Sequence, residues 1–315
     1  LVAPLVIFII LAPTLSRIFH TKELNKFGIY ATKWLSIRKL LAGIFAAIAT
    51  TIIFSLPMIP ESSPNLINTA YDSVQSLINM FLTSSYFYAI YASIFVAIVS
   101  SKIRPLAAVL DHIVKGIEEI GVYLQFFVPF FMFAVGSYIY NLPKKVLEHT
   151  EGVSKEILNE IKLFGINIDP STIKGIITVY ILGSLLVGIV CFIWHLGFII
   201  MTKVECKKFS IKRYFTMYWI KVYPLLWATS SESIATPLNL SLTKKHAPWV
   251  DNEVRRFVVG TGSFLNINGT IICVIVLAGL IASMLSIPIS LIDLLLLVPI
   301  VVLISYGVPG IPGEL

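Results

Sequence analysis

The chain has 315 residues, of which 57% are hydrophobic and 13% are charged, and its formal net charge is +7. Soluble domains are about 45–50% apolar and about 25% charged, so this composition excludes a cytosolic enzyme, a secreted disulfide scaffold and a disordered chain. The positive charge does not indicate nucleic-acid binding, because the basic residues lie in short breaks between long apolar runs. We therefore expect a lipid bilayer around most of the chain and no nucleic-acid partner.

The long apolar runs predict an all-α polytopic membrane protein, because backbone polar groups in lipid must be satisfied internally. At about 20 residues per span, the chain has room for roughly seven to nine membrane segments. The runs are too long for the alternating strands of about ten residues that form a membrane β-barrel. The expected spans are residues 1–18, 27–56, 74–99, 113–140, 173–201 and 257–285, with a shorter apolar run at 291–306.

The basic residues orient these spans, because lysine and arginine are enriched in cytoplasmic loops. The breaks after the first, third and fifth spans are basic, whereas residues 57–71 after the second span contain no lysine or arginine. In the break after the fourth span, four lysines are offset by four glutamates, and residues 148–169 are expected to form an external amphipathic or loop segment. We predict a multi-pass protein of the cell (inner) membrane with loops 19–26, 102–110, 203–213 and 244–256 in the cytoplasm.

Residues 214–242 lie between two basic clusters, so both ends of this segment are expected on the cytoplasmic side. Each of its two apolar arms is about 12–15 residues long, which is too short to cross a bilayer. These features predict a re-entrant hairpin whose tip is the polar stretch 229–237, and an ordinary loop between two short helices is the alternative. Glu232 lies in this tip without a lysine or arginine nearby in sequence, and an intramembrane carboxylate indicates a functional site.

A second polar break, residues 260–270, interrupts the apolar run at 257–285 with three glycines, two asparagines and three hydroxyl residues. Glycine and asparagine loosen a helix, and an unwound stretch exposes carbonyl oxygens that suit Na⁺ or K⁺. The alternative is a face of small residues for helix packing. A third break at residues 307–313 is rich in glycine and proline, and it is a candidate for the tip of a second hairpin.

Taken in order, the three breaks resemble the motifs of the dicarboxylate/amino acid:cation symporters, the glutamate-transporter family. That family has a serine-rich first hairpin tip, an Asn-Met-Asp-Gly-Thr break in its seventh helix and a Gly-Val-Pro-Gly second tip. The resemblance covers the whole chain, with residues 1–18 similar to the family's second helix and Leu315 inside its second hairpin. It therefore implies a chain that is truncated at both ends, without the family's eighth helix. The matching segments here are residues 229–237, Asn266-Ile267-Asn268-Gly269-Thr270 and Gly307-Val308-Pro309-Gly310.

The resemblance implies an elevator-type secondary transporter with re-entrant hairpins, normally a homotrimer. The implied substrate is an acidic or neutral amino acid or a C4-dicarboxylate, coupled to Na⁺ or H⁺, with no covalent cofactor and no catalytic residues. The implied division of the chain is scaffold helices at 1–112, linking helices at 113–202 and part of a transport domain at 203–315.

The resemblance also assigns the residues of the site. Two positions depart from the family's pattern, because Asn268 stands for an aspartate and Ile267 for a methionine. These departures remove one negative charge and one thioether from the expected cation site. The implied cation positions are Gly262, Phe264, Asn266 and Asn268. The implied substrate contacts are Ser230, Ser231, Glu232, Ser233 and Thr270, together with the backbone at Val308, Pro309, Gly310 and Pro312.

Other charged residues allow two interpretations each. Arg38 and Lys39 fall near positions that carry small hydroxyl side chains beside the family's ion site, and snorkelling of both to the cytoplasmic face is the favoured interpretation. The alternative is a fixed cation that replaces one Na⁺. His195 inside the fifth span is either a packed histidine or a proton relay. Residues 111, 112, 118 and 119 have the composition of a metal cluster, but a solvated helix end is expected there.

Two other functions stay open from sequence. An intramembrane hydrolase would use a buried serine with Glu232 or His195 as its base, because a nucleophile needs a base within hydrogen-bond reach. The chain has neither a Gly-x-Ser-x-Gly elbow nor a His-Glu-x-x-His pair, which disfavours this function. A transport-inactive or ion-uncoupled family member that acts as a membrane scaffold or channel is the second alternative.

Overall fold

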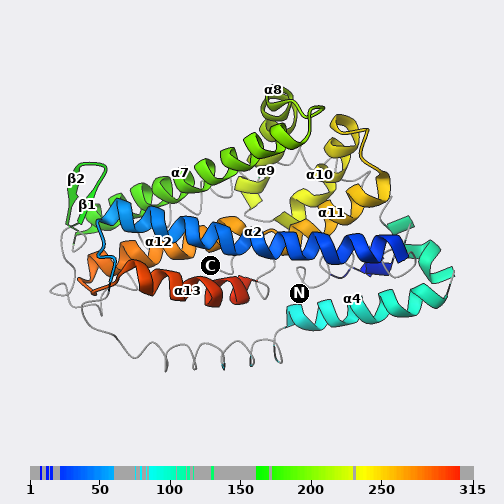
Figure 1. Ribbon diagram of the computed structural model, residues 1–315, viewed down its shortest axis with the longest axis horizontal. Helices are drawn as coiled ribbons and strands as arrows, with labels where there is room; N and C mark the ends of the chain where they lie inside the picture. The colour runs from blue at the N-terminus through cyan, green and yellow to red at the C-terminus, as the bar shows by residue number, and fades with distance from the viewer. Residues whose placement is uncertain are drawn as a thin grey trace.

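Helices make up nearly all of the chain that the computed structural model describes (Figure 1). The structure describes residues 22–59, 85–103, 105–110, 161–169, 172–229 and 232–305, and a few isolated positions between 8 and 130. Expected spans 1–18 and 113–140 therefore lie almost entirely outside the described residues. The described helices are α2 (Lys22–Phe54), α4 (Ser85–Lys102), α7 (Ile173–Glu205), α8 (Ile211–Arg213), α9 (Ile220–Thr229), α10 (Glu232–His246), α11 (Asn252–Leu265), α12 (Asn268–Met284) and α13 (Leu291–Ser305), with a π-helical segment η3 (Tyr214–Trp219) before α9.

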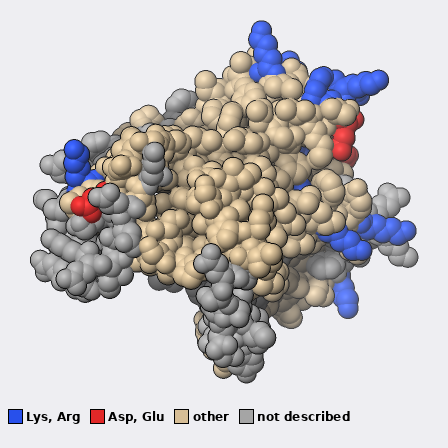
Figure 2. All heavy atoms as spheres, turned by 60° about the vertical axis from the view of Figure 1, so that its left-hand side comes forward, with Lys and Arg blue, Asp and Glu red and all other residues tan. Residues whose placement is uncertain are grey.

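Helices α2 and α7 coincide with the spans expected at 27–56 and 173–201, and both contain a segment long and apolar enough to cross a membrane. Each also presents apolar side chains to the surroundings, as Ile52 at 73% and Val204 at 76% exposure illustrate. Figure 2 shows a broad belt without charged side chains between the lysines and arginines that gather toward the ends of the molecule. A large exposed apolar surface indicates a membrane or protein interface, which agrees with a membrane protein.

Helix α2 packs against α12, α13 and α7 in the largest buried cluster of the described chain. Small residues allow these helices to approach, as they do in many membrane proteins. A Cβ atom on Gly43 would lie 2.5 Å from Val298 Cγ1, and one on Gly279 would collide with Thr50. The predicted division of the chain into parts 1–112, 113–202 and 203–315 stays a prediction. Helix α2, in the first of these parts, nevertheless packs against α12 and α13, which lie in the last.

Helices α9 and α10 pair in an antiparallel hairpin. Near its open end, the Tyr218 hydroxyl donates a hydrogen bond to Asn239 Oδ1 at 2.7 Å. Closer to the tip, Val222 and Leu225 pack in one apolar cluster with Leu238 and other residues of α10. Figure 1 places α8 and the α10–α11 connection at the same end of the molecule. This geometry is a helical hairpin with both ends at one end of the molecule, and its re-entry into a membrane stays a prediction.

The tip of this hairpin is narrower than the sequence predicts. We expect a polar, non-helical stretch at 229–237, but α9 continues to Thr229 and α10 begins at Glu232. Pro237 is helical, and the Thr236 hydroxyl donates to the carbonyl oxygen of Glu232 at 2.9 Å. Helical hydrogen bonds therefore extend into this polar segment and satisfy backbone groups that a non-helical stretch would leave without a partner.

The apolar run expected at 257–285 is divided into α11 and α12, and Asn266 and Ile267 lie between the two helices. A break in this run was expected within 260–270, and the structure limits it to these two residues. Helix α13 follows α12 and begins with a reciprocal cap, in which Ser290 N–H donates to Asp293 Oδ2 at 2.8 Å and Asp293 N–H donates to Ser290 Oγ at 3.3 Å. The cap fixes where α13 starts against α12.

A short β-hairpin before α7 was not predicted. Strands β1 (Ile161–Leu163) and β2 (Ile166–Ile168) pair with Ile161 opposite Ile168, where the sequence indicates an amphipathic or loop segment. The turn is Phe164 at φ 50° and Gly165 at φ 81°, the left-handed pair that a tight hairpin turn requires. Phenylalanine rarely adopts positive φ, so the sequence contains no ordinary turn signal here.

The packing of α2 on α12 generates a stability prediction. Gly279→Ala should lower the Tm, because its Cβ would overlap Thr50 and overpacking of a core costs about 1–3 kcal/mol. Gly188→Ala in α7 is the matched control, since nothing lies within 4 Å of its Cβ position and alanine is the better helix former. Thermal unfolding of the purified protein in detergent compares the two. Equal Tm values for both variants would contradict the close approach of α2 and α12.

The hairpin itself generates a second prediction. Burial lowers the pKa of His246, and the positive charges of Lys245, Arg213 and Lys221 lower it further. Arg213 lies before α9, and His246 is the last residue of α10. The two residues are therefore neighbours only if α9 and α10 lie side by side in an antiparallel hairpin. A positive charge disfavours the imidazolium, so Arg213→Gln should raise the pKa of His246 in an NMR titration. Lys208→Gln is the control, and the hairpin geometry fails if both substitutions have the same effect.

Candidate functional site

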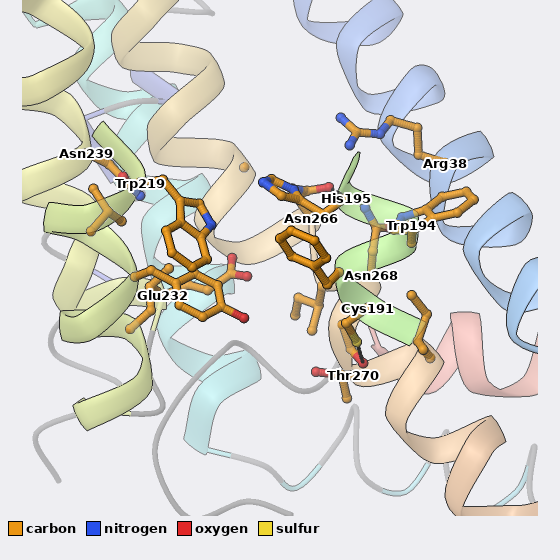
Figure 3. Close-up of a pocket in the computed structure, with 18 of the residues that line it drawn as sticks. Arg38, Cys191, Trp194, His195, Trp219, Glu232, Asn239, Asn266, Asn268 and Thr270 are labelled. Atoms are coloured by element: carbon orange, nitrogen blue, oxygen red, sulfur yellow. Dashed lines mark hydrogen bonds between the residues drawn. The ribbon is translucent and has the colours of Figure 1, made fainter. Parts of the chain in front are cut away.

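A cavity of about 620 Å³ lies between α2, α7, the α9–α10 hairpin and the break between α11 and α12 (Figure 3). It gathers residues that are far apart in the sequence, because the hairpin tip and the helix break meet at its wall. Five of the residues expected at the site line it: Glu232, Gly262, Asn266, Asn268 and Thr270. The structure therefore brings the polar hairpin tip and the second polar break to one place.

The other expected site residues are not placed. Ser230, Ser231, Val308, Pro309, Gly310 and Pro312 lie outside the described residues, as do the side chains of Ser233 and Phe264. Asp111, Glu118 and Glu119 of the possible metal cluster also lie outside them. His112 is exposed, and its Nδ1 lies 2.8 Å from the carbonyl oxygen of Ala108. Among the residues that the structure describes, no group of three or more His, Cys, Asp or Glu could hold a metal ion.

The break between α11 and α12 holds an unpaired oxygen at the cavity wall. Asn268 Nδ2 donates to Asn266 Oδ1 at 2.8 Å, which fixes both amides relative to one another. Asn268 is only 6% exposed, and its Oδ1 has no hydrogen-bond partner. A buried unpaired polar atom costs about 1–3 kcal/mol. An amide oxygen left in this state suits a hard cation or a ligand N–H group.

Among the expected cation positions, Asn268 offers an unpaired oxygen, whereas the oxygens of Asn266 and Gly262 each already accept one hydrogen bond. The carbonyl oxygen of Gly262 accepts the Asn266 backbone N–H at 2.8 Å, which closes the last turn of α11. A carbonyl oxygen has a second lone pair, so this bond does not prevent Gly262 from binding an ion. Ile267, between Asn266 and Asn268, is 4% exposed. Its φ of −91° and ψ of 50° are non-helical and separate α11 from α12.

Arg38 and His195 form a basic side of the cavity. The Arg38 guanidinium carbon lies 3.9 Å from the centroid of the Phe198 ring, a cation–π contact, and its Nε is buried without a hydrogen-bond partner. His195 Nε2 and the Tyr214 hydroxyl lie 2.8 Å apart and share a hydrogen bond. His195 is therefore a cavity-lining histidine with a hydrogen-bond partner. A proton relay through His195 stays a prediction. Figure 3 shows Glu232 on the side of the cavity opposite Arg38, with Asn266 and Asn268 between them.

Lys39 contradicts the snorkelling interpretation. Its side chain is 0% exposed, and its Nζ donates to Ser305 Oγ of α13 at 3.0 Å. Adjacent residues of a helix point about 100° apart, so Arg38 reaches the cavity while Lys39 enters the interface with α13. The orientation of α2 relative to α13 decides this burial, and the residues next to Lys39 in the sequence do not reveal it.

An aromatic wall of the cavity was missed from sequence. Tyr214 stacks on Tyr218 with ring centroids 5.3 Å apart, and Trp219 stacks on Tyr223 at 4.4 Å. All four residues line the cavity, and they occupy η3 and the start of α9. The repeat of aromatic residues every four positions was the available signal. A π-helical turn changes the direction of such side chains, and π-helical turns are frequent at functional sites.

Residues 162–314 match the family model described as the sodium:dicarboxylate symporter family. The match covers the C-terminal part of the chain, just under half of its length. The resemblance inferred from the three polar breaks is thereby confirmed over these residues. All cavity-lining residues except Arg38 lie inside the matched range, so the cavity belongs mainly to the matched segment. A comparison of the chain with curated proteins found no match.

Proposed function

We propose that the protein is a secondary active symporter that couples a Na⁺ or H⁺ gradient to the uptake of a small anionic or amino-acid substrate. The observation that carries this proposal is the coincidence of the family match with the cavity that contains Glu232, Asn266, Asn268 and Thr270. The matched family is a family of transporters and not of enzymes, which supports a non-enzymatic function.

The charges around the cavity favour a zwitterionic amino acid over a C4-dicarboxylate as substrate. The Arg38 guanidinium is available to a substrate carboxylate, because its Nε has no other partner. Glu232 on the opposite side would attract an ammonium group and repel a second carboxylate. Asn266 and Asn268 supply neutral donors and acceptors between them, which suits the middle of a small polar molecule.

The coupling ion would bind at the break between α11 and α12. Asn268 Oδ1 is buried and unpaired, so a Na⁺ ion there would satisfy an oxygen that the protein leaves free. H⁺ coupling would use Glu232 instead, since it is the acidic residue on the described part of the cavity wall. The elevator movement, the homotrimer and the cell-membrane orientation with cytoplasmic loops belong to the proposal by analogy with the family.

The alternatives receive less support. A hydrolase would need a serine beside a base, yet His195 Nε2 shares its hydrogen bond with the Tyr214 hydroxyl. A scaffold would have no use for a cavity lined by opposite charges. A channel shares the polar wall, so uptake against a gradient is the property that separates it from a symporter.

Transport into proteoliposomes tests the proposal. Full-length protein should accumulate radiolabelled aspartate above the external concentration when an inward Na⁺ or H⁺ gradient is imposed. Labelled succinate should accumulate less than aspartate, because aspartate carries an ammonium group that Glu232 can attract and succinate has none. Equilibration without accumulation would indicate a channel, and absence of uptake under both gradients would indicate a scaffold.

Asn268 provides the sharpest variant for this assay. Asn268→Ala should reduce gradient-driven uptake about tenfold, the effect of losing about 1.4 kcal/mol of binding. Its Tm in ion-free buffer should not fall by more than that of a surface variant, since the unpaired Oδ1 is itself unfavourable. Asn167→Ala, at an exposed position of β2, is the matched control. Unchanged uptake in Asn268→Ala would remove this residue from the site.

A further inference from the structure

The turn of the β1–β2 hairpin presents two large apolar side chains to the surroundings. Phe164 is 52% exposed and Ile166 is 51% exposed. The remaining apolar residues of the same hairpin, Ile161, Leu163 and Ile168, are buried in the largest cluster of the described chain. The hairpin is therefore packed against the protein along its strands, and only its turn carries apolar side chains that the described residues do not cover.

The backbone of the turn does not account for a phenylalanine at this position. Phe164 has φ 50° and Gly165 has φ 81°, the two positive values of a turn that favours asparagine followed by glycine. A side chain with a Cβ atom is strained in this conformation, and a bulky one is rarely found there. The exposed ring is therefore expected to have a contact outside the hairpin.

The hairpin is held rigidly against the first turn of α7. Thr172 Oγ1 donates to the carbonyl oxygen of Asp169 at 2.9 Å and accepts the Gly175 backbone N–H at 3.0 Å. A Cβ atom on Gly175 would collide with the same carbonyl oxygen, so the end of the hairpin approaches the helix as closely as a glycine allows. Both strands also contact α7. The turn therefore has a defined position relative to this helix.

That position is the edge of the expected membrane span. From Lys174 the next lysine or arginine in the chain is Lys203, and exposed apolar side chains follow from Tyr180 onward. A charged residue that bounds such a segment is expected near the lipid headgroups. Figure 1 shows the hairpin beside the start of α7, with its turn projecting across the direction of the long helices and not beyond their ends. A turn that projects sideways at this level meets the boundary between water and lipid.

We propose that the β1–β2 turn is a membrane-interface anchor, in which Phe164 and Ile166 insert between the lipid headgroups and the first part of the acyl chains. Lipid is the partner that fits, because the hairpin is fixed to α7 and the exposed side chains of α7 are themselves apolar. The anchor holds the start of α7 at one level of the bilayer. It goes beyond the proposed function, since it requires contact with lipid and not transport.

Phe164→Trp tests the anchor in full-length protein in nanodiscs whose lipids carry bromine on the acyl chains, because bromine quenches indole fluorescence only at close range. Subtraction of the wild-type emission isolates the added indole, and most of this added emission should be lost in brominated lipid. Asn167→Trp is the matched control, because Asn167 is exposed on β2 and neighbouring strand residues point to opposite faces. Its added emission should be retained. Equal quenching of the two added indoles, or quenching of neither, would overturn the anchor.

Ile166→Trp repeats the measurement at a strand position of the same turn, in case Phe164→Trp does not fold. The double variant Phe164→Asn/Ile166→Trp then tests whether the phenylalanine itself inserts. Asparagine before Gly165 suits the turn, so the hairpin should be retained while one of the two anchoring side chains is lost. Quenching of the added indole should therefore be weaker in the double variant than in Ile166→Trp alone. Equal quenching in both would show that Phe164 does not insert and would overturn its part in the anchor.

Discussion

The close packing of α2 against α12 and α13 is the contact on which the rest of the described structure depends. It needs glycine where the helices meet, since a side chain at Gly43 or Gly279 would meet Val298 or Thr50. In lipid, such van der Waals packing replaces the hydrophobic effect as the force that holds helices together. Because it sets the rotation of α2, it also decides that Arg38 faces the cavity and that Lys39 faces α13.

The cavity is built from interrupted helices rather than from a cluster of charged groups. The break at Asn266 and Ile267 and the hairpin tip before Glu232 both place helix ends beside the cavity, where backbone groups and amide side chains can bind a ligand. Each interruption is supported by local bonds, such as Asn268 to Asn266 and Tyr218 to Asn239. The site therefore has fixed polar groups without a large cost of buried charge.

The sequence predicts those features that depend on neighbouring residues. The helix break follows from glycine and asparagine in an apolar run, and the hairpin follows from two basic clusters around a segment too short to span. Features that depend on the rotation of one helix against another were missed or wrong. The burial of Lys39 depends on which face of α2 meets α13, and the β-hairpin depends on a phenylalanine at positive φ, which local preference opposes.

Arg38 and Lys39 of α2 have different surroundings and therefore different roles. Arg38 is half-buried over Phe198 and has an unpaired nitrogen, so a substrate carboxylate can reach it and leave again. Lys39 is sealed from the cavity and cannot exchange its partners with the substrate. The orientation of this one helix thereby separates a cation that a ligand in the cavity can contact from a cation that holds α2 against α13.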